Sequence, residues 1–241
     1  MWRIRQRRQR QHIMKITFIS DTHNKHNHLT SNAYNNILGS GDVLVHAGDC
    51  TSMGKSHEIT NFLNWFAMTD FKHKIFIAGN HDFGFELHSD ISEEFKDRGV
   101  IYLYDNEVVI DGVKFYGSPW QPEFYDWAFN LPRGEKLAEK WAMIPGNTDI
   151  LITHGPAHGM LDWTPSGQRV GCEDLFKRIM EVQPKIHVCG HIHCAYGQKN
   201  FNGVEFLNAS VLNERYEYEN KPIKLEFDVN DKQIVEYYET N

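Results

Sequence analysis

Five short apolar runs in this chain end in side chains that bind metals well, and this pattern restricts the fold more than any other feature. Each run is rich in β-branched residues and has Gly or Asp at its end, as expected of buried strands. They cover residues 15–21, 42–49, 74–82, 149–155 and 185–193. Helical periodicity is found between them, at residues 57–68, 134–144 and 172–182. Strands alternating with helices predict an α/β fold with largely parallel pairing early in the chain.

The end of the chain has a different pattern. Three strand-like runs, at residues 203–210, 223–229 and 233–239, follow one another with no helical pattern between them. Residues 230–232 form a turn signal between the last two, and Asp111-Gly112 predicts another hairpin. We therefore expect a second, more antiparallel sheet that packs on the first within one domain.

Polar side chains stand where the predicted strands end. Ligands of open α/β sheets bind beyond the carboxyl ends of the strands. Asp21 and Asp49 are 28 residues apart, and Asp49 and Asn80 are 31 apart. Each step fits one β-α-β unit of ~30 residues, so the strand ends should meet at one rim of the sheet. The side chains expected there are Asp21, His23, Asp49, Asn80, His154, His191 and His193.

This mixture of side chains suits a pair of divalent transition-metal ions. Two ions ~3.5–4 Å apart can clamp a phosphoryl group, and a carboxylate between them offsets their repulsion. Imidazole suits borderline metals, while carboxylate and amide oxygens suit harder ones. His191 and His193 are two positions apart, so an extended backbone sends both side chains to the same side. The set favours Mn²⁺, with Fe, Zn, Co or Ni as alternatives, over Mg²⁺ or Ca²⁺.

The stretch CGHIHC, from Cys189 to Cys194, also allows a self-contained zinc knuckle. Its two histidines lie too close together between the cysteines for all four side chains to wrap one ion easily. We expect these histidines to serve the larger site and the cysteines to be packing residues. Four cysteines in 241 residues do not indicate a disulfide framework, which favours a reducing, cytoplasmic compartment.

Charge separates the first residues from the rest of the chain. Arginine occupies positions 3, 5, 7, 8 and 10, whereas the whole chain has a formal net charge of −7. An acidic body does not favour a general nucleic-acid binder. We interpret residues 1–13 as a disordered extension or the product of an upstream start codon, with a basic arm for RNA or a membrane surface as the alternative. No apolar run is long enough to predict a transmembrane span.

Five short motifs follow one another along the chain. They are Asp21-Thr22-His23, Gly48-Asp49, Gly79-Asn80-His81-Asp82, His154-Gly155 and the Gly-His-x-His of residues 190–193. In this order they resemble the calcineurin-like metallophosphoesterase superfamily, over about residues 15–210. Residues 117–134, 153–163 and 169–175 further resemble the metallophosphoesterase-domain-containing subgroup related to cyclic-nucleotide phosphodiesterases.

The resemblance implies a fold and a ligand set. The implied fold is a four-layer α-β-β-α sandwich of two mixed sheets flanked by helices, formed by residues 14–241. The implied ligands are Asp21, His23 and His193 for a first metal, Asn80, His154 and His191 for a second, and Asp49 as the bridge.

His81 would be the catalytic residue beside the metals. By resemblance, it protonates the leaving oxygen or stabilises charge on the phosphoryl group. Some superfamily members orient this histidine with an aspartate a few residues after the Gly-Asp motif. Here no acid follows Asp49 before Glu58, so the sequence leaves the partner of His81 open.

The implied activity is hydrolysis of small phosphodiesters, with cyclic nucleotides as the first candidates, by in-line attack of a metal-bridging hydroxide. A phosphomonoesterase is the nearest alternative, and a weakly active metal-loaded nucleotide-binding protein is the alternative from another class. The expected partner is a small phosphodiester, rather than a membrane or a nucleic acid. His26, His158 and Arg169 are candidate substrate contacts, with a solvated loop the alternative for His26 and a surface ion pair for Arg169.

Overall fold

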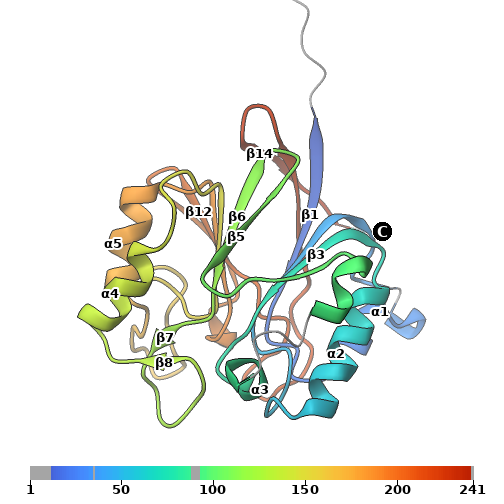
Figure 1. Cartoon of the computed structure of the whole chain (residues 1–241), viewed down its shortest axis with the longest axis horizontal. Coiled ribbons are helices and arrows are strands. Elements are labelled where there is room, and N and C mark those ends of the chain that lie inside the picture. The colour runs from blue at the N-terminus through green and yellow to red at the C-terminus, as the bar shows by residue number, and fades with distance from the viewer. Residues whose placement is uncertain (1–11, 35, 88–92, 240–241) are drawn as a thin grey trace, which may run out of the picture.

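Two six-stranded sheets lie face to face, and helices cover the outer side of each (Figure 1). The computed structural model describes residues 12–34, 36–87 and 93–239. The basic residues expected to form an N-terminal extension fall almost entirely within positions 1–11, outside the described residues. The predicted four-layer α-β-β-α architecture is confirmed.

The first sheet has the strand order β14-β13-β1-β2-β3-β4. Strands β1 to β4 run parallel to one another, and the hairpin of β13 and β14 adds to β1 in antiparallel fashion. The strands are β1 (Ile13–Ile19), β2 (Gly41–Ala47), β3 (Phe71–Ile77), β4 (Val100–Tyr102), β13 (Ile223–Asp228) and β14 (Gln233–Tyr237).

The second sheet has the strand order β11-β12-β10-β9-β6-β5. Its four central strands are parallel, and β5 and β11 form antiparallel edges, with β5 and β6 making the hairpin predicted at Asp111-Gly112. The strands are β5 (Asn106–Ile110), β6 (Val113–Ser118), β9 (Ile150–Thr153), β10 (Ile186–Cys189), β11 (Gly197–Phe201) and β12 (Val204–Asn208). A small separate pair consists of β7 (Gln121–Pro122) and β8 (Asn130–Leu131).

The helices form the two outer layers. The three helical segments predicted from periodicity are present within two residues at each end, as α2, α4 and α5. The α-helices are α1 (Asn27–Thr30), α2 (Ser56–Met68), α3 (Phe83–Leu87), α4 (Glu135–Ala142) and α5 (Glu173–Val182), and the 3₁₀ turns are η1 (Asn32–Tyr34), η2 (Glu93–Arg98) and η3 (His193–Ala195). None of the helices in the described ranges has the length and apolar character needed to cross a bilayer.

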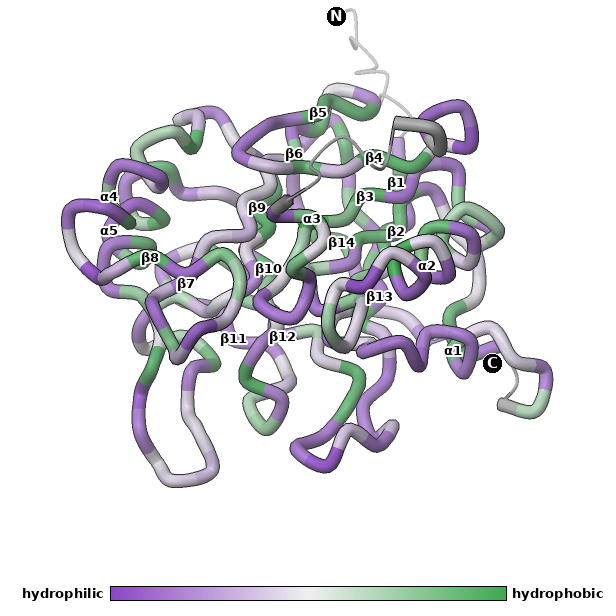
Figure 2. The backbone as a smooth tube through the Cα atoms, turned by 60° about the horizontal axis from the view of Figure 1, so that its bottom comes forward, coloured by the Kyte–Doolittle hydropathy of each residue, from purple (hydrophilic) through white to green (hydrophobic). Residues whose placement is uncertain are grey.

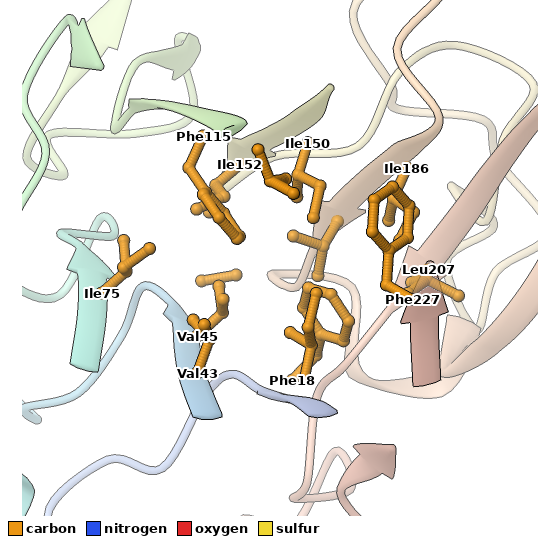
Figure 3. Packing of buried hydrophobic residues seen from close by; sticks show 14 of the residues in the cluster. Phe18, Val43, Val45, Ile75, Phe115, Ile150, Ile152, Ile186, Leu207 and Phe227 are labelled. Atoms are coloured by element: carbon orange, nitrogen blue, oxygen red, sulfur yellow. The ribbon is translucent and has the colours of Figure 1, made fainter. Parts of the chain in front are cut away.

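The main core lies between the two sheets (Figure 3). Val43 and Val45 of β2 point into it, and Phe115 of β6 and Ile152 of β9 meet them from the second sheet. Leu44 points the other way, into the core beneath α2. Because neighbouring side chains leave a strand on opposite faces, a continuous apolar run serves two cores at once. Burying each such side chain contributes about 1.5–3 kcal/mol.

The expected arrangement of the C-terminal strands is wrong in one respect. We expected these three strands to build the second sheet, but β12 joins the second sheet while β13 and β14 extend the first. Similarly, β9 and β10 belong to the second sheet, not to the sheet of β1 to β3. The strand ends therefore meet across the edges of two packed sheets rather than along one rim. Apolar periodicity identifies a strand but does not identify its neighbours.

Candidate metal centre

The seven expected ligands come together where the parallel strands of both sheets end. Strand β1 begins near the top of Figure 1, so the carboxyl ends face the bottom, and Figure 2 turns this edge forward. The chain turns sharply as it leaves these strands. Asp21, Asp49 and His191 have positive φ values of 55°, 55° and 67°, which residues other than glycine rarely adopt. Such strain is found where a functional site over-determines the backbone.

The first ligand group consists of Asp21, His23 and His193. Their ligand atoms all lie within 4.8 Å of one another, and all three residues are buried. His193 Nε2 is 3.4 Å from Asp21 Oδ1. Both ring nitrogens of His23 are buried without a hydrogen-bond partner, although buried polar atoms are nearly always satisfied. A cation in this group would supply the missing partner, so the donor set fits a metal ion.

The second ligand group lies on the other side of Asp49. It contains Asp49, His154 and His191, whose ligand atoms also lie within 4.8 Å of one another. His154 Nε2 is 3.3 Å from Asp49 Oδ2. The amide oxygen of Asn80 joins it, 3.0 Å from His154 Nε2. Asp49 Oδ2 is also 3.6 Å from His23 Nε2 in the first group. One carboxylate oxygen therefore lies next to both groups, as expected of a ligand that bridges two ions through a single atom.

The protonation of the metal-free groups follows from burial and from two ion pairs. Burial would lower the pKa of His154, but the charge of Asp49 outweighs it and raises that pKa to about 9. Burial also opposes protonation of His193, but the hydrogen bond to Asp21 outweighs it and raises the pKa of His193 to about 9. Burial lowers the pKa of His23 to about 4. Cations that bind here must displace the protons of the two ion pairs.

His81 stands beside both groups. Its backbone N–H donates to Asp49 Oδ1 over 2.8 Å, and its Nε2 lies 4.0 Å from Asp49 Oδ2. The Nδ1 atom is 2.8 Å from the carbonyl oxygen of Ser52. A carbonyl only accepts, so Nδ1 carries a hydrogen and Nε2 is the atom free to exchange a proton. The orienting partner that the sequence left open is this backbone carbonyl.

Asp82, the last residue of the Gly-Asn-His-Asp motif, ties the loops after β2 and β3 together. Its Oδ1 accepts from the backbone N–H and the hydroxyl of Thr51, at 2.9 and 2.6 Å. Its Oδ2 accepts from the backbone N–H of Cys50 and of Gly79, at 3.2 and 2.8 Å. The carboxylate is fully buried. This network fixes the turn that presents Asn80 and His81, a role that our sequence analysis missed.

A pocket of about 450 Å³ opens over the two groups. Asp49, Asn80, His81, His191 and His193 form its floor. Phe124, Trp127 and Tyr216 line its sides, and Trp127 packs on His81 with ring centroids 4.2 Å apart. The pocket thus places an apolar, partly aromatic wall next to the predicted catalytic histidine.

The three candidate substrate contacts are not among the residues that line this pocket. His26 is fully buried against α2, with its ring 4.8 Å from that of Trp65. Arg169 pairs with Asp162 over 2.8 Å, and His158 Nδ1 lies 3.9 Å from the same carboxylate. The geometry therefore corrects the assignment of His26, which is a packing residue, and favours the surface ion pair for Arg169.

Arg133 lines the pocket instead, and nothing in the sequence marked it. Its guanidinium donates to the carbonyl oxygens of Val170 and Gly171, at 2.6 and 2.8 Å, and to Glu173 Oε2 at 2.6 Å. These bonds join the segment before α4 to the segment before α5. Its charge is therefore already balanced, so it supports one wall of the pocket.

The zinc-knuckle alternative finds no support in the geometry. Within the described ranges, the ligand groups contain histidines and aspartates but no cysteine. All four cysteines are free, and burial raises the pKa of Cys189 far above its usual value. Cys194 donates to the carbonyl oxygen of Trp163 over 3.2 Å. His191 and His193 instead lie in the two ligand groups of the larger cluster.

Comparison with known proteins decides the family. The family model of the calcineurin-like phosphoesterase superfamily domain matches residues 14–220. The chain belongs to this superfamily. Its members are metallophosphoesterases, hydrolases of phosphate esters, and the family typically depends on a dinuclear metal centre.

Several relatives resemble the chain over most of its length. It is 41% identical over 236 residues to human metallophosphoesterase domain-containing protein 1, a match that covers 88% of this chain and 70% of that protein. The UPF0046 protein T07D4.2 of Caenorhabditis elegans is 37% identical over 215 residues, covering 77% and 54% of the two chains.

Solved structures support the fold. The protein TT1561 of Thermus thermophilus has a TM-score of 0.61 at 12% identity, covering 95% of this chain and 99% of that one. The phosphopantetheinyl hydrolase PptH of Mycobacterium tuberculosis has a TM-score of 0.55 at 18% identity, covering 84% and 90%.

Proposed function

We propose that this protein is a binuclear-metal-dependent phosphodiesterase that hydrolyses small phosphodiesters, with cyclic nucleotides as the first candidates. The observation that carries the proposal is the shared carboxylate. Asp49 Oδ2 lies 3.6 Å from His23 Nε2 of one ligand group and 3.3 Å from His154 Nε2 of the other. Bound there, two divalent ions would act as Lewis acids that polarise the phosphoryl oxygens and offset the charge developing on them.

The first ion would be held by Asp21, His23 and His193 and the second by Asn80, His154 and His191, with Asp49 between them. Mixed imidazole and carboxylate donors favour Mn²⁺, with Fe, Zn, Co or Ni as alternatives. The backbone carbonyls of Asn213 and Ala47 accept from Nδ1 of His193 and His154, at 3.0 and 2.9 Å. These bonds leave both Nε2 atoms to bind metal.

His81 would assist the departure of the leaving group. The carbonyl of Ser52 fixes its ring, and Nε2 faces the floor of the pocket. When the bond between phosphorus and the leaving oxygen breaks, a proton on Nε2 can pass to that oxygen. Trp127 covers one face of the imidazole and helps to hold it in this position.

The charges of the pocket favour a monoanionic diester over a dianionic monoester. Among the described residues that line it, Arg133 is the sole lysine or arginine, and Glu173 already pairs with it. Glu123 and Glu214 also line the pocket. A leaving group without further phosphates fits these surroundings, and the ring of Phe124, half exposed, offers it an apolar surface.

We also propose that the protein acts in the cytoplasm on a small molecule and that residues 14–241 form its catalytic domain. The four free thiols, three of them buried, support a reducing compartment.

A steady-state assay tests the proposed activity. Chelator-treated protein, with and without Mn²⁺, would be given bis-p-nitrophenyl phosphate, p-nitrophenyl phosphate and 2′,3′- and 3′,5′-cyclic nucleotides. We expect Mn²⁺-dependent cleavage of the diesters, lost in His81→Ala and Asp49→Asn and kept in the exposed control variant His57→Ala. Cleavage of the monoester alone would assign the phosphomonoesterase alternative. Binding of two ions without turnover would favour the nucleotide-binding protein.

A further inference from the structure

The chain crosses from the second sheet to the first within residues 210–219, named here the crossing segment. It leaves the end of β12, and Ser210 pairs with Ser20 just beyond the end of β1. The backbone N–H of Val211 then donates to the carbonyl oxygen of Ser20 over 3.1 Å. The segment therefore passes directly beside the first ligand group, and it contacts each of the three members of that group in a different way.

The contact with Asp21 is a hydroxyl hydrogen bond. Ser210 Oγ donates to Asp21 Oδ2 over 2.6 Å, and both residues are fully buried. The other carboxylate oxygen, Oδ1, is the one that faces His193 Nε2 at 3.4 Å. Ser210 thus fixes which oxygen of Asp21 is presented to the ligand group.

The contact with His193 is made through the backbone. Its Nδ1 donates to the carbonyl oxygen of Asn213 over 3.0 Å, which leaves Nε2 as the ligand atom. The Asn213 side chain organises the turn that holds this carbonyl. Its Oδ1 accepts from the backbone N–H of Arg215 and of Glu217, at 2.9 and 3.0 Å.

The contact with His23 is made by ring packing. No hydrogen bond orients this imidazole, since both of its ring nitrogens lack a partner. Instead the ring of Tyr216 meets it edge-on at 4.8 Å and 90°, and His81 meets it at 4.6 Å and 87°. Tyr216 is held there at a φ of 59°, in a backbone conformation that tyrosine rarely adopts. The segment therefore maintains an unfavourable conformation at the position where its ring supports a ligand.

The second ligand group is supported mainly from other parts of the chain, although the backbone N–H of His191 donates to both carboxylate oxygens of Asp21 at 3.1 Å. The carbonyl of Ala47, at the end of β2, orients His154, and Asp82 fixes the turn that carries Asn80. We propose that the crossing segment sets the metal affinity of the first position more strongly than that of the second, with Ser210 and Tyr216 as positioning residues. This proposal rests on the binuclear centre of the proposed function.

Metal titration of the full chain tests it. Chelator-treated protein would be titrated with Mn²⁺ by calorimetry and with Co²⁺ by visible absorption, which reports ligand geometry. We expect Ser210→Ala and Tyr216→Leu to weaken one of two sites about 10–100-fold. The other site should weaken several-fold less, although Asp49 and the hydrogen bonds from His191 to Asp21 connect the two groups. The more strongly weakened site should be the one that His193→Ala removes, and its Co²⁺ spectrum should change more than the spectrum of the other site.

Two variants separate positioning from general damage. Tyr216→Phe keeps the ring, so its metal affinity and Co²⁺ spectrum should equal those of the unmodified chain. Tyr125→Leu, at an exposed position outside the pocket lining, should have no effect on either site. Thermal unfolding shows whether Tyr216→Leu folds. If it does not, the metal affinities of Ser210→Ala and Tyr216→Phe still test the role of the crossing segment.

Equal weakening of both sites, or none, in a chain that binds two ions would overturn the role of the crossing segment and leave the phosphodiesterase intact. A chain that binds only one ion at any concentration would overturn the binuclear centre, and this proposal with it.

Discussion

Replacing Asp82 by asparagine should destabilise the fold and disturb the site together. Oδ1 of Asp82 accepts from the backbone N–H and the hydroxyl of Thr51 and from the thiol of Cys50, and Oδ2 accepts from the backbone N–H of Cys50 and of Gly79. An asparagine side chain has one acceptor oxygen. If its NH₂ group takes the place of Oδ2, the backbone N–H groups of Cys50 and Gly79 lose their acceptor. If it takes the place of Oδ1, the Thr51 hydroxyl can turn to accept from it, but the backbone N–H of Thr51 loses its acceptor.

The magnitude follows from the less costly orientation, in which one backbone N–H loses its acceptor. A hydrogen bond to a charged group contributes about 1.5–3 kcal/mol, which is the expected size of the loss. Burial and the charge of Asp49 raise the pKa of Asp82, which reduces the benefit of its negative charge. We therefore expect the lower part of this range, a loss of about 2 kcal/mol in the free energy of unfolding.

Denaturant unfolding of metal-free protein measures this change, with the exposed variant Asp126→Asn as the matched control. The diesterase rate should fall in Asp82→Asn as well, because the turn that presents Asn80 and His81 loses its anchor. An unfolding free energy within about 0.5 kcal/mol of the unmodified chain, together with full activity, would refute the reasoning.

Four further predictions concern the site itself. His81→Ala should lower kcat about 100–10,000-fold while two ions still bind, and loss of an ion would instead make His81 a ligand. Because the pKa values of His154 and His193 are raised to about 9, Mn²⁺ binding near pH 7 should release protons, and the affinity should rise as pH increases toward about 9; calorimetry in two buffers checks this. A histidine pKa that is raised by folding means that the protonated form stabilises the metal-free fold. This stabilisation is present below pH 6.5 and is lost as pH rises through about 9, which thermal unfolding measures. Gly190→Ala should displace Asp21 and weaken metal binding at the first position, since the added Cβ would lie 2.1 Å from Asp21 Oδ2. Gly146→Ala is the control: its Cβ would meet open space, so it should bind Mn²⁺ as the unmodified chain does.

The sequence predicted most strands and the three long helices α2, α4 and α5, because burial leaves a strong periodic pattern, but it missed the short elements β4, β7, β8, β11, α1 and α3. The ends of β1, β2 and β3 could be brought together from spacing alone, since parallel strands linked by helices have little freedom in their connections. The pairing of β13 with β1 could not be predicted. An apolar strand shows the same pattern in either sheet, and only the three-dimensional packing selects its neighbour.

The site was predictable where side-chain chemistry is distinctive, and not where ordinary groups support it. The backbone carbonyl of Ser52 that orients His81 has no residue signature. Ser210 and Tyr216 act through their position in space, far along the chain from Asp21 and His23. The prediction that His26 contacts substrate was wrong for the opposite reason. Its residue type suggested a site in a stretch rich in histidine, yet the chain turns it beneath α2.

Anomalous diffraction from crystals grown with Mn²⁺ tests the central claim most directly. We predict two peaks ~3.5–4 Å apart. One should lie among Asp21, His23 and His193, the other among Asn80, His154 and His191, with Asp49 between them. A single peak, or two peaks that do not share Asp49, would contradict a binuclear centre bridged by this carboxylate.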